Sequence, residues 1–217
     1  MQAIEISVNY DFICPWCWIG HLKLASGIRE ANLPVPVSIQ YVPFELNPTM
    51  PADGMDRREY RTAKFGSWVR SQGMDAQVAA AGVAAGAPFN YDKVTRTPNT
   101  RLAHQLMQFA MSSGDAQKTA ALYQAIFTAY FSEGRDIGRL ETLVAIAAAN
   151  GFDATAAQEY LTQGRGVAKV EEAERLAERQ GIRSVPTVFI AGEAISGAQP
   201  PAVFTAALRA ALERSAA

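Results

Sequence analysis

The two cysteines of this chain, Cys14 and Cys17, lie near its start and are separated by only two residues. Residues 4–10 alternate apolar and polar side chains, which predicts a half-buried strand. Residues 15–31 carry apolar side chains at helical spacing, and they begin with a proline, which is favoured in the first turn of a helix. The pair therefore lies where a strand passes into a helix, and we expect both sulfurs at a helix N-terminus.

This position suits the chemistry of a reactive dithiol. A thiolate, not a thiol, attacks a disulfide, and the free N–H groups and dipole of a helix N-terminus stabilise negative charge. We expect Cys14, at the cap, to be the exposed nucleophile. Cys17 lies one turn further in on the same face, as a resolving thiol should. Between them, Pro15 and Trp16 tune the redox potential, and Trp16 should be exposed beside the sulfurs.

Other uses of a cysteine pair fit this sequence less well. A structural disulfide over so short a loop restrains little chain entropy. Zinc needs two further ligands, and the only histidines of the chain are His21 and His104. A covalent haem would need histidine after the second cysteine, where Trp18 stands. We therefore expect neither a metal nor a separate cofactor, because the sulfur pair is itself the redox group.

The chain divides into three parts by its patterns. Residues 1–45 are predicted to form strand, helix and strand, with the second strand over 35–43. Residues 46–180 are rich in alanine, leucine, arginine and glutamate and are broken by glycines, which predicts six or seven helices. Residues 181–217 are predicted to form a hairpin and a last helix. Helix N-caps are expected at five polar residues: Asp56, Asn99, Asp115, Asp136 and Asp153.

Composition narrows the partners and the compartment. The net charge is −1, which argues against nucleic acid or an anionic membrane as the main partner. No segment approaches the roughly 20 apolar residues that span a bilayer. The first residues lack the pattern of a secretory signal, so we expect a cytoplasmic protein. In a reducing compartment a lone cysteine pair is usually catalytic or redox-sensing.

A second feature precedes the predicted C-terminal hairpin. Pro186 cannot donate a ladder hydrogen bond at the start of the apolar strand that follows it. If the Val185–Pro186 bond is cis, the backbone groups of Val185 face outward beside the sulfur pair. They could then pair with an extended substrate peptide by β-augmentation.

These features resemble a known superfamily. The chain is similar to the thioredoxin fold in its DsbA-like form, and more closely to FrnE-type disulfide oxidoreductases, which implies an α/β fold of βαβ and ββα halves with a large all-helical insertion. The segments that carry the resemblance are Asp11–Gly20, Pro43–Pro48, Asn99-Thr100 with Ala103-His104, Tyr130-Phe131 with Glu133-Gly134 and Asp136-Ile137, Val185–Thr187, and Ser196–Pro200.

The resemblance implies a thiol–disulfide oxidoreductase in which a cis Pro186 faces the cysteine pair. Its substrate would be a protein or small-molecule thiol or disulfide, with glutathione as a possible co-substrate and a homodimer as a possible assembly. The resemblance also implies a substrate groove between the thioredoxin part and the helical insertion, formed by Phe44, Asn47, Asn99, Thr100 and His104. For His104 the sequence alone favours a buried structural role over lining the groove.

Two other functions stay open. Glutathione-dependent isomerases and transferases of the 2-hydroxychromene-2-carboxylate isomerase type form a sister branch of the superfamily, usually with serine at the position of Cys14. A second thiol such as Cys17 has no use in that reaction, which favours redox exchange. The other alternative is a binding module whose cysteines act only as a passive redox sensor.

Overall fold

A computed structural model describes residues 3–216, and its main sheet has four strands in the order β2-β1-β5-β6. β1 and β2 are parallel, whereas β5 runs antiparallel to both β1 and β6. Helix α1 (Pro15–Ala31) connects the parallel pair, since parallel strands need a crossover connection. The strands are β1 (Ile4–Tyr10), β2 (Val37–Pro43), β5 (Thr187–Ile190) and β6 (Glu193–Ser196). The predicted strands and first helix are confirmed.

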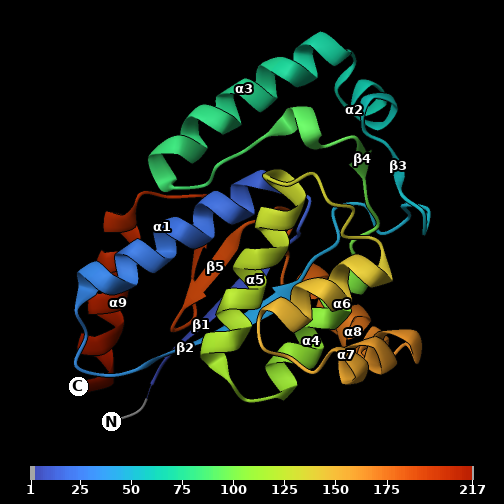
Figure 1. Cartoon of the computed structure of the whole chain (residues 1–217). Helices are drawn as coiled ribbons and strands as arrows, with labels where there is room; N and C mark the ends of the chain where they lie inside the picture. The colour runs from blue at the N-terminus through green and yellow to red at the C-terminus, as the bar shows by residue number, and fades with distance from the viewer. Residues whose placement is uncertain (1–2, 217) are drawn as a thin grey trace.

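The helical insertion lies between β2 and β5, as predicted (Figure 1). It also holds a feature that the sequence patterns did not reveal, an antiparallel pair of two-residue strands, β3 (Met55–Asp56) and β4 (Arg96–Thr97). The helices of the insertion are α2 (Arg57–Phe65), α3 (Trp68–Ala85), α4 (Arg101–Ser112), α5 (Ala116–Phe131), α6 (Leu140–Ala149), α7 (Ala154–Thr162) and α8 (Val167–Arg179), with a 3₁₀ turn at Tyr91–Lys93.

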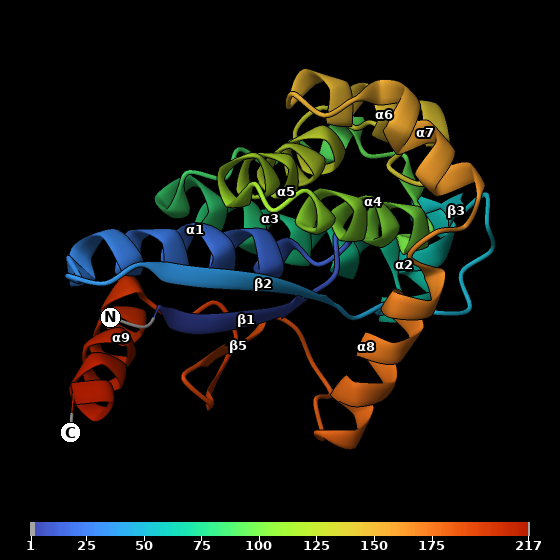
Figure 2. The ribbon, with the colours of Figure 1, turned by 90° about the horizontal axis from the view of Figure 1, so that it is seen from below.

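One face of the sheet forms the core. In Figure 2, α1, α4 and α5 lie on one side of β1 and β2. The alternate side chains on that face are buried, including Val8, Tyr41 and Val188. On the other face Ser7 and Phe189 are half-buried and Gln40 is exposed. The sheet is therefore covered mainly on one face, and β2 and β6 are its two edges.

Helix ends follow local chemistry. The side chains of Asp56, Asp115 and Asp153 each accept a backbone N–H in the first turn of the helix that follows, as predicted. The caps predicted at Asn99 and Asp136 are wrong, because α4 begins after Thr100 and α6 after Arg139. Asn99 instead accepts the N–H of Arg101, and Asp136 accepts that of Gly138, so both side chains stabilise turns.

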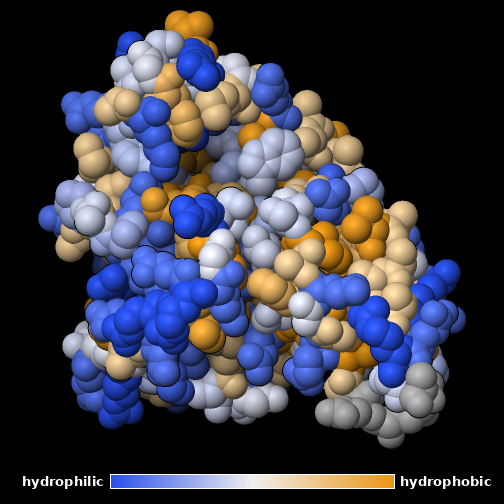
Figure 3. All heavy atoms as spheres, turned by 180° about the vertical axis from the view of Figure 1, so that it is seen from behind, coloured by the Kyte–Doolittle hydropathy of each residue, from blue (hydrophilic) through white to orange (hydrophobic). Residues whose placement is uncertain are grey.

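The last helix of the chain packs against the first, and α8 lies at the surface. α9 (Pro201–Ala216) packs closely on α1, where a Cβ at Gly27 would lie 2.8 Å from the Cβ of Phe204. α8 exposes a charged surface, and hydrophilic side chains gather over it in Figure 3. None of the helices in residues 3–216 is long and apolar enough to cross a membrane.

Candidate active site around Cys14 and Cys17

Backbone hydrogen bonds hold Cys14 at the N-cap of α1. Its N–H donates to the carbonyl oxygen of Asp11 (3.0 Å), and its own carbonyl accepts the N–H of Cys17 (3.0 Å). Its backbone is extended, at φ −91° and ψ 107°, and Pro15 occupies the first turn. Both cysteines are free thiols. The expected position at a helix N-terminus is therefore confirmed.

The two thiols differ in depth. Cys17 has no exposed surface, in agreement with its expected inner position. Cys14 retains only 6% of its surface, so the prediction of an exposed nucleophile is wrong. The sulfur is recessed because the cis-proline segment and the insertion helices α2 and α3 lie around it. Trp16 is 42% exposed beside the pair, as expected.

Val185 contacts the sulfur of Cys14 directly. The Cys14 thiol donates to the carbonyl oxygen of Val185 (3.5 Å), and the Val185–Pro186 bond is cis. Within residues 3–216 the N–H of Val185 has no acceptor. The backbone beside the sulfur thus offers one free donor, with its acceptor already engaged by the thiol.

The environment of Cys17 keeps it protonated. Burial raises its pKa well above the ordinary value, and the hydrogen bond with the Cys14 thiol adds to this effect. Removal of charge from water is costly, so a buried thiolate forms less readily than an exposed one. Cys17 therefore has to lose its proton before it can attack a neighbouring sulfur.

Asp11 joins the cysteine loop to the helical insertion. Its carboxylate accepts the N–H of Leu46 (2.7 Å), and its Oδ1 lies 3.4 Å from Nε2 of His104 on α4. Asp11 and His104 are both fully buried, and the imidazole packs against the rings of Tyr10 and Phe12. His104 therefore supports the site from behind instead of lining a substrate groove.

A pocket of about 280 Å³ opens over Cys14, with Arg61 and Lys64 of α2 on its wall. Arg57 and Arg61 both bind Asp75 (2.7 and 2.8 Å), whereas Lys64 forms no ion pair with any described residue, so three cations face a single carboxylate in the lining. The pocket is therefore positively charged and also aromatic. Its lining residues are Ile13, Cys14, Pro15, Trp16, Leu46, Arg57, Tyr60, Arg61, Lys64, Phe65, Met74, Asp75, Val78, Tyr91, Thr97, Tyr130 and Phe131.

The five residues predicted for the groove do not line this pocket. Asn47 contacts two residues that do line the pocket, because its Oδ1 accepts hydrogen bonds from the Tyr60 hydroxyl (2.7 Å) and from Lys64 Nζ (3.2 Å). Asn99 donates to the carbonyl of Met50 (2.8 Å) and so connects two loops.

Thr100 is buried before α4, and Phe44 lines a different pocket with Glu45 and Arg183. The residues predicted for the groove therefore do not form one surface: most of them support loops, and Phe44 lines a second, separate cavity.

The sequence did contain a signal for the pocket-lining residues of α2, which were not among the predicted site residues. Arg57, Tyr60, Arg61 and Lys64 recur at three- and four-residue spacing, which places them on one face of α2. What the pattern does not give is the direction in which that face points. In the part of the chain that the structure describes, no group of three or more histidine, cysteine, aspartate or glutamate residues is arranged to hold a metal.

Comparison with protein families agrees with this geometry. The model of the DSBA-like thioredoxin domain matches residues 5–209. The chain belongs to this family. A crystal structure of a probable DsbA oxidoreductase from Streptomyces coelicolor is 28% identical, with a TM-score of 0.85, over 97% of this chain and 90% of that one.

Two further solved structures share the fold at lower sequence identity. The 2-hydroxychromene-2-carboxylate isomerase is 17% identical with a TM-score of 0.73, over 98% of each chain. The cytosolic disulfide reductase DsbM from Pseudomonas aeruginosa, solved with glutathione, is 20% identical with a TM-score of 0.68, over 96% of this chain and 99% of that one. The DSBA-like fold thus serves both redox exchange and isomerisation among these neighbours.

Proposed function

We propose that this DSBA-like protein is a thiol–disulfide oxidoreductase of the FrnE type, with Cys14 as nucleophile and Cys17 as resolving thiol. One observation carries the proposal. The Cys14 sulfur lies at the N-terminus of α1, against Val185 and at the floor of a pocket, while Cys17 is buried one turn behind it. This arrangement admits a substrate to one sulfur only.

The exchange then follows in two steps. The Cys14 thiolate attacks one sulfur of a substrate disulfide, forming a mixed disulfide and releasing the other substrate sulfur as a thiolate that takes up a proton. The Cys17 thiolate next attacks the Cys14 sulfur, which closes the Cys14–Cys17 disulfide and releases the second substrate thiol. Two electrons pass from the protein dithiol to the substrate, and the reverse sequence oxidises a substrate dithiol.

The recess favours slender substrates. An extended peptide can reach a sulfur on a pocket floor and pair with the free N–H of Val185, whereas a flat protein surface cannot. Arg57, Arg61 and Lys64 outnumber the single acid Asp75, so the pocket also suits a small anionic thiol. Glutathione carries two carboxylates and belongs to that class, and DsbM was solved with it.

The location and assembly belong to the same proposal. A cytoplasmic protein that exchanges electrons with glutathione would keep its cysteine pair mainly reduced. The homodimer stays a prediction, which light scattering of the purified protein tests directly.

Reduction of insulin by dithiothreitol, followed by turbidity, tests the function. Wild type should accelerate the reaction and Cys14→Ser should lose the acceleration. Isomerisation of 2-hydroxychromene-2-carboxylate with glutathione, retained in Cys14→Ser, would support the isomerase instead. Turnover by neither protein in either assay would leave the passive sensor. The second cysteine argues against the isomerase, because that reaction needs no resolving thiol.

A further inference from the structure

The outer edge of β2 carries backbone groups without partners. The N–H of Ile4 donates to the carbonyl of Pro36 (3.0 Å), and the N–H of Phe44 donates to that of Tyr10 (2.9 Å). Since residues of a parallel strand face one neighbour at every second position, the even-numbered residues of β2 bond to β1. The odd-numbered ones therefore direct their N–H and C=O outward.

These outward residues are Val37, Ile39 and Tyr41, and within residues 3–216 none of their backbone groups has a hydrogen-bond partner. A row of free donors and acceptors at strand spacing is the surface to which a further strand adds. These free backbone groups make the edge more selective than an apolar patch, which would bind apolar surfaces of many shapes.

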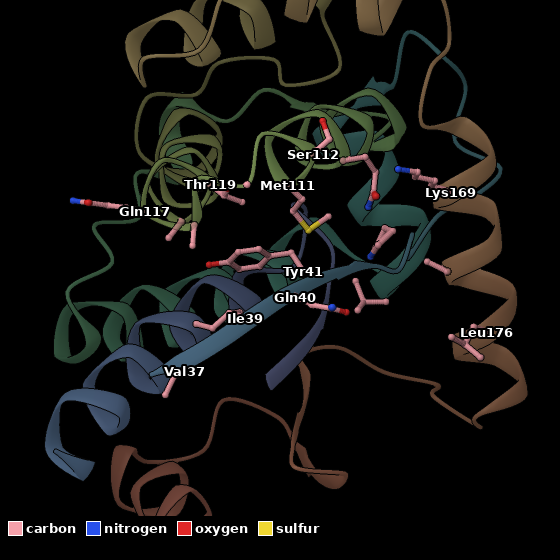
Figure 4. A pocket seen from close by; sticks show the side chains of 17 residues that line it. Val37, Ile39, Gln40, Tyr41, Met111, Ser112, Gln117, Thr119, Lys169 and Leu176 are labelled. Carbon is pink, nitrogen blue, oxygen red and sulfur yellow. The ribbon is translucent and has the colours of Figure 1, made fainter. Parts of the chain in front are cut away.

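The edge lies inside a groove of about 780 Å³, larger than the pocket over Cys14. In Figure 4, β2 runs below Met111, Ser112, Gln117 and Thr119 of α4 and α5, and Lys169 and Leu176 of α8 lie at the right. The walls are mainly apolar, so the groove suits side chains that alternate along an extended segment. Neither cysteine lines it.

One charge marks the groove. Lys169 is the only lysine, arginine, histidine, aspartate or glutamate among its lining residues, and it forms no ion pair with any described residue. A segment that carries a carboxylate at the α8 end would therefore meet an unopposed cation.

We propose that the groove binds an extended, acidic-ended segment of a partner protein, which adds to β2 as a fifth strand. The outward residues from Val37 to Tyr41 match a segment of about five residues, at roughly 3.3 Å per residue. A second copy of this chain is a poorer occupant, because its own β2 is recessed between the same helical walls. The docking site is separate from the sulfur pair and places a partner on the side of the sheet away from β6.

Fluorescence anisotropy with defined peptides tests the proposal. The probe is acetyl-Glu-Val-Thr-Val-Thr-Val-Glu-amide with an uncharged fluorophore, so a carboxylate reaches Lys169 in either strand direction. A matched probe has lysine in place of both glutamates. Wild type should prefer the acidic probe, and Lys169→Glu should reverse the preference by roughly threefold or more. Two probes N-methylated at alternate amides should differ, since only one edge of the peptide pairs with β2.

Protein variants separate the edge from the fold. Ile39→Pro removes an outward N–H while leaving the ladder to β1 intact, so it should abolish binding; Ile39→Val should retain it. Both variants should keep insulin reduction and circular dichroism at wild-type levels. Absence of binding by either probe at millimolar concentration, or a preference that Lys169→Glu does not change, would overturn the proposal. A dimer in light scattering that Ile39→Pro dissolves would assign the groove to a second copy and overturn it too.

Discussion

The Cys14 thiol and the carbonyl oxygen of Val185 are 3.5 Å apart, although 171 positions separate the two residues in the sequence. This contact brings the N-terminus of α1 against the cis-proline segment, and a substrate sulfur has to enter between Cys14 and the pocket wall. The same contact occupies the Val185 carbonyl while the thiol is protonated. Ionisation of Cys14 removes the donated proton and so frees the carbonyl to accept from a substrate backbone.

The resolving step should depend on pH through Cys17. Burial raises the pKa of this thiol, and that cause persists when Cys14 is part of a mixed disulfide. While Cys17 is mostly protonated, the rate of resolution should rise about tenfold per pH unit. Acid quenching of single-turnover reactions with a disulfide-bonded peptide, followed by mass spectrometry, measures it. A lifetime of the mixed disulfide that stays constant from pH 6 to 9 would contradict the assignment.

Lys64 should select anionic substrates. It lies on the wall of the pocket and has no carboxylate partner among the described residues. We expect Lys64→Gln to lower kcat/KM for glutathione disulfide about threefold to tenfold relative to the neutral bis(2-hydroxyethyl) disulfide. Lys93→Gln is the matched control, because Lys93 is exposed outside the pocket. Equal losses for both substrates would mean that Lys64 acts only on the structure of α2.

Asp75 should be essential for the stability of α2 and α3. Its carboxylate binds two guanidinium groups, and both Asp75 and Arg57 are buried. Asp75→Asn leaves two cations without their counter-charge and should cost about 3 kcal/mol of unfolding free energy. Urea denaturation measures the change. The exposed neighbour Asp92 provides the control, since Asp92→Asn should change stability by less than about 0.5 kcal/mol.

His21 should make the fold sensitive to mild acid. Burial lowers its pKa to about 4, and its Nδ1 is enclosed without a hydrogen-bond partner beside Tyr123. The unfolded chain protonates this histidine near pH 6.5, so stability is complete above that pH and is lost as the pH falls toward 4. Between pH 7.5 and 5 the loss should be about 2 kcal/mol.

Urea denaturation of wild type and His21→Leu at both pH values isolates this contribution. The variant should lose less stability than wild type on acidification, because leucine does not titrate. An identical loss in the two proteins would show that other groups carry the acid sensitivity.

Periodicity was sufficient to predict the parts of the fold that are long and regular. Residues 4–10 and 15–31 match β1 and α1 residue for residue. The strands β3 and β4 have two residues each, which is too short for any period. The caps at Asn99 and Asp136 failed because turn hydrogen bonds competed for the same side chains.

The positions of the two cysteines in the fold could be predicted from the sequence, but the residues that surround Cys14 could not. Cys14, Cys17 and Pro186 stand in local patterns that restrict their geometry. The recess over Cys14 depends on α2 and α3, which fold back over the cysteine loop from far along the chain. No local pattern encodes such a return. The burial of Cys14 and the position of Arg61 and Lys64 on the pocket wall are therefore seen only in the structure.

The most direct test of the account is to trap the covalent intermediate. Cys17→Ser should accumulate a mixed disulfide with a disulfide-bonded peptide, and tandem mass spectrometry should locate the bond at Cys14. In wild type the same complex should be transient and should decay to a Cys14–Cys17 disulfide. A stable adduct at Cys17 in Cys14→Ser, formed as fast as the one at Cys14, or no adduct in either variant, would contradict the account.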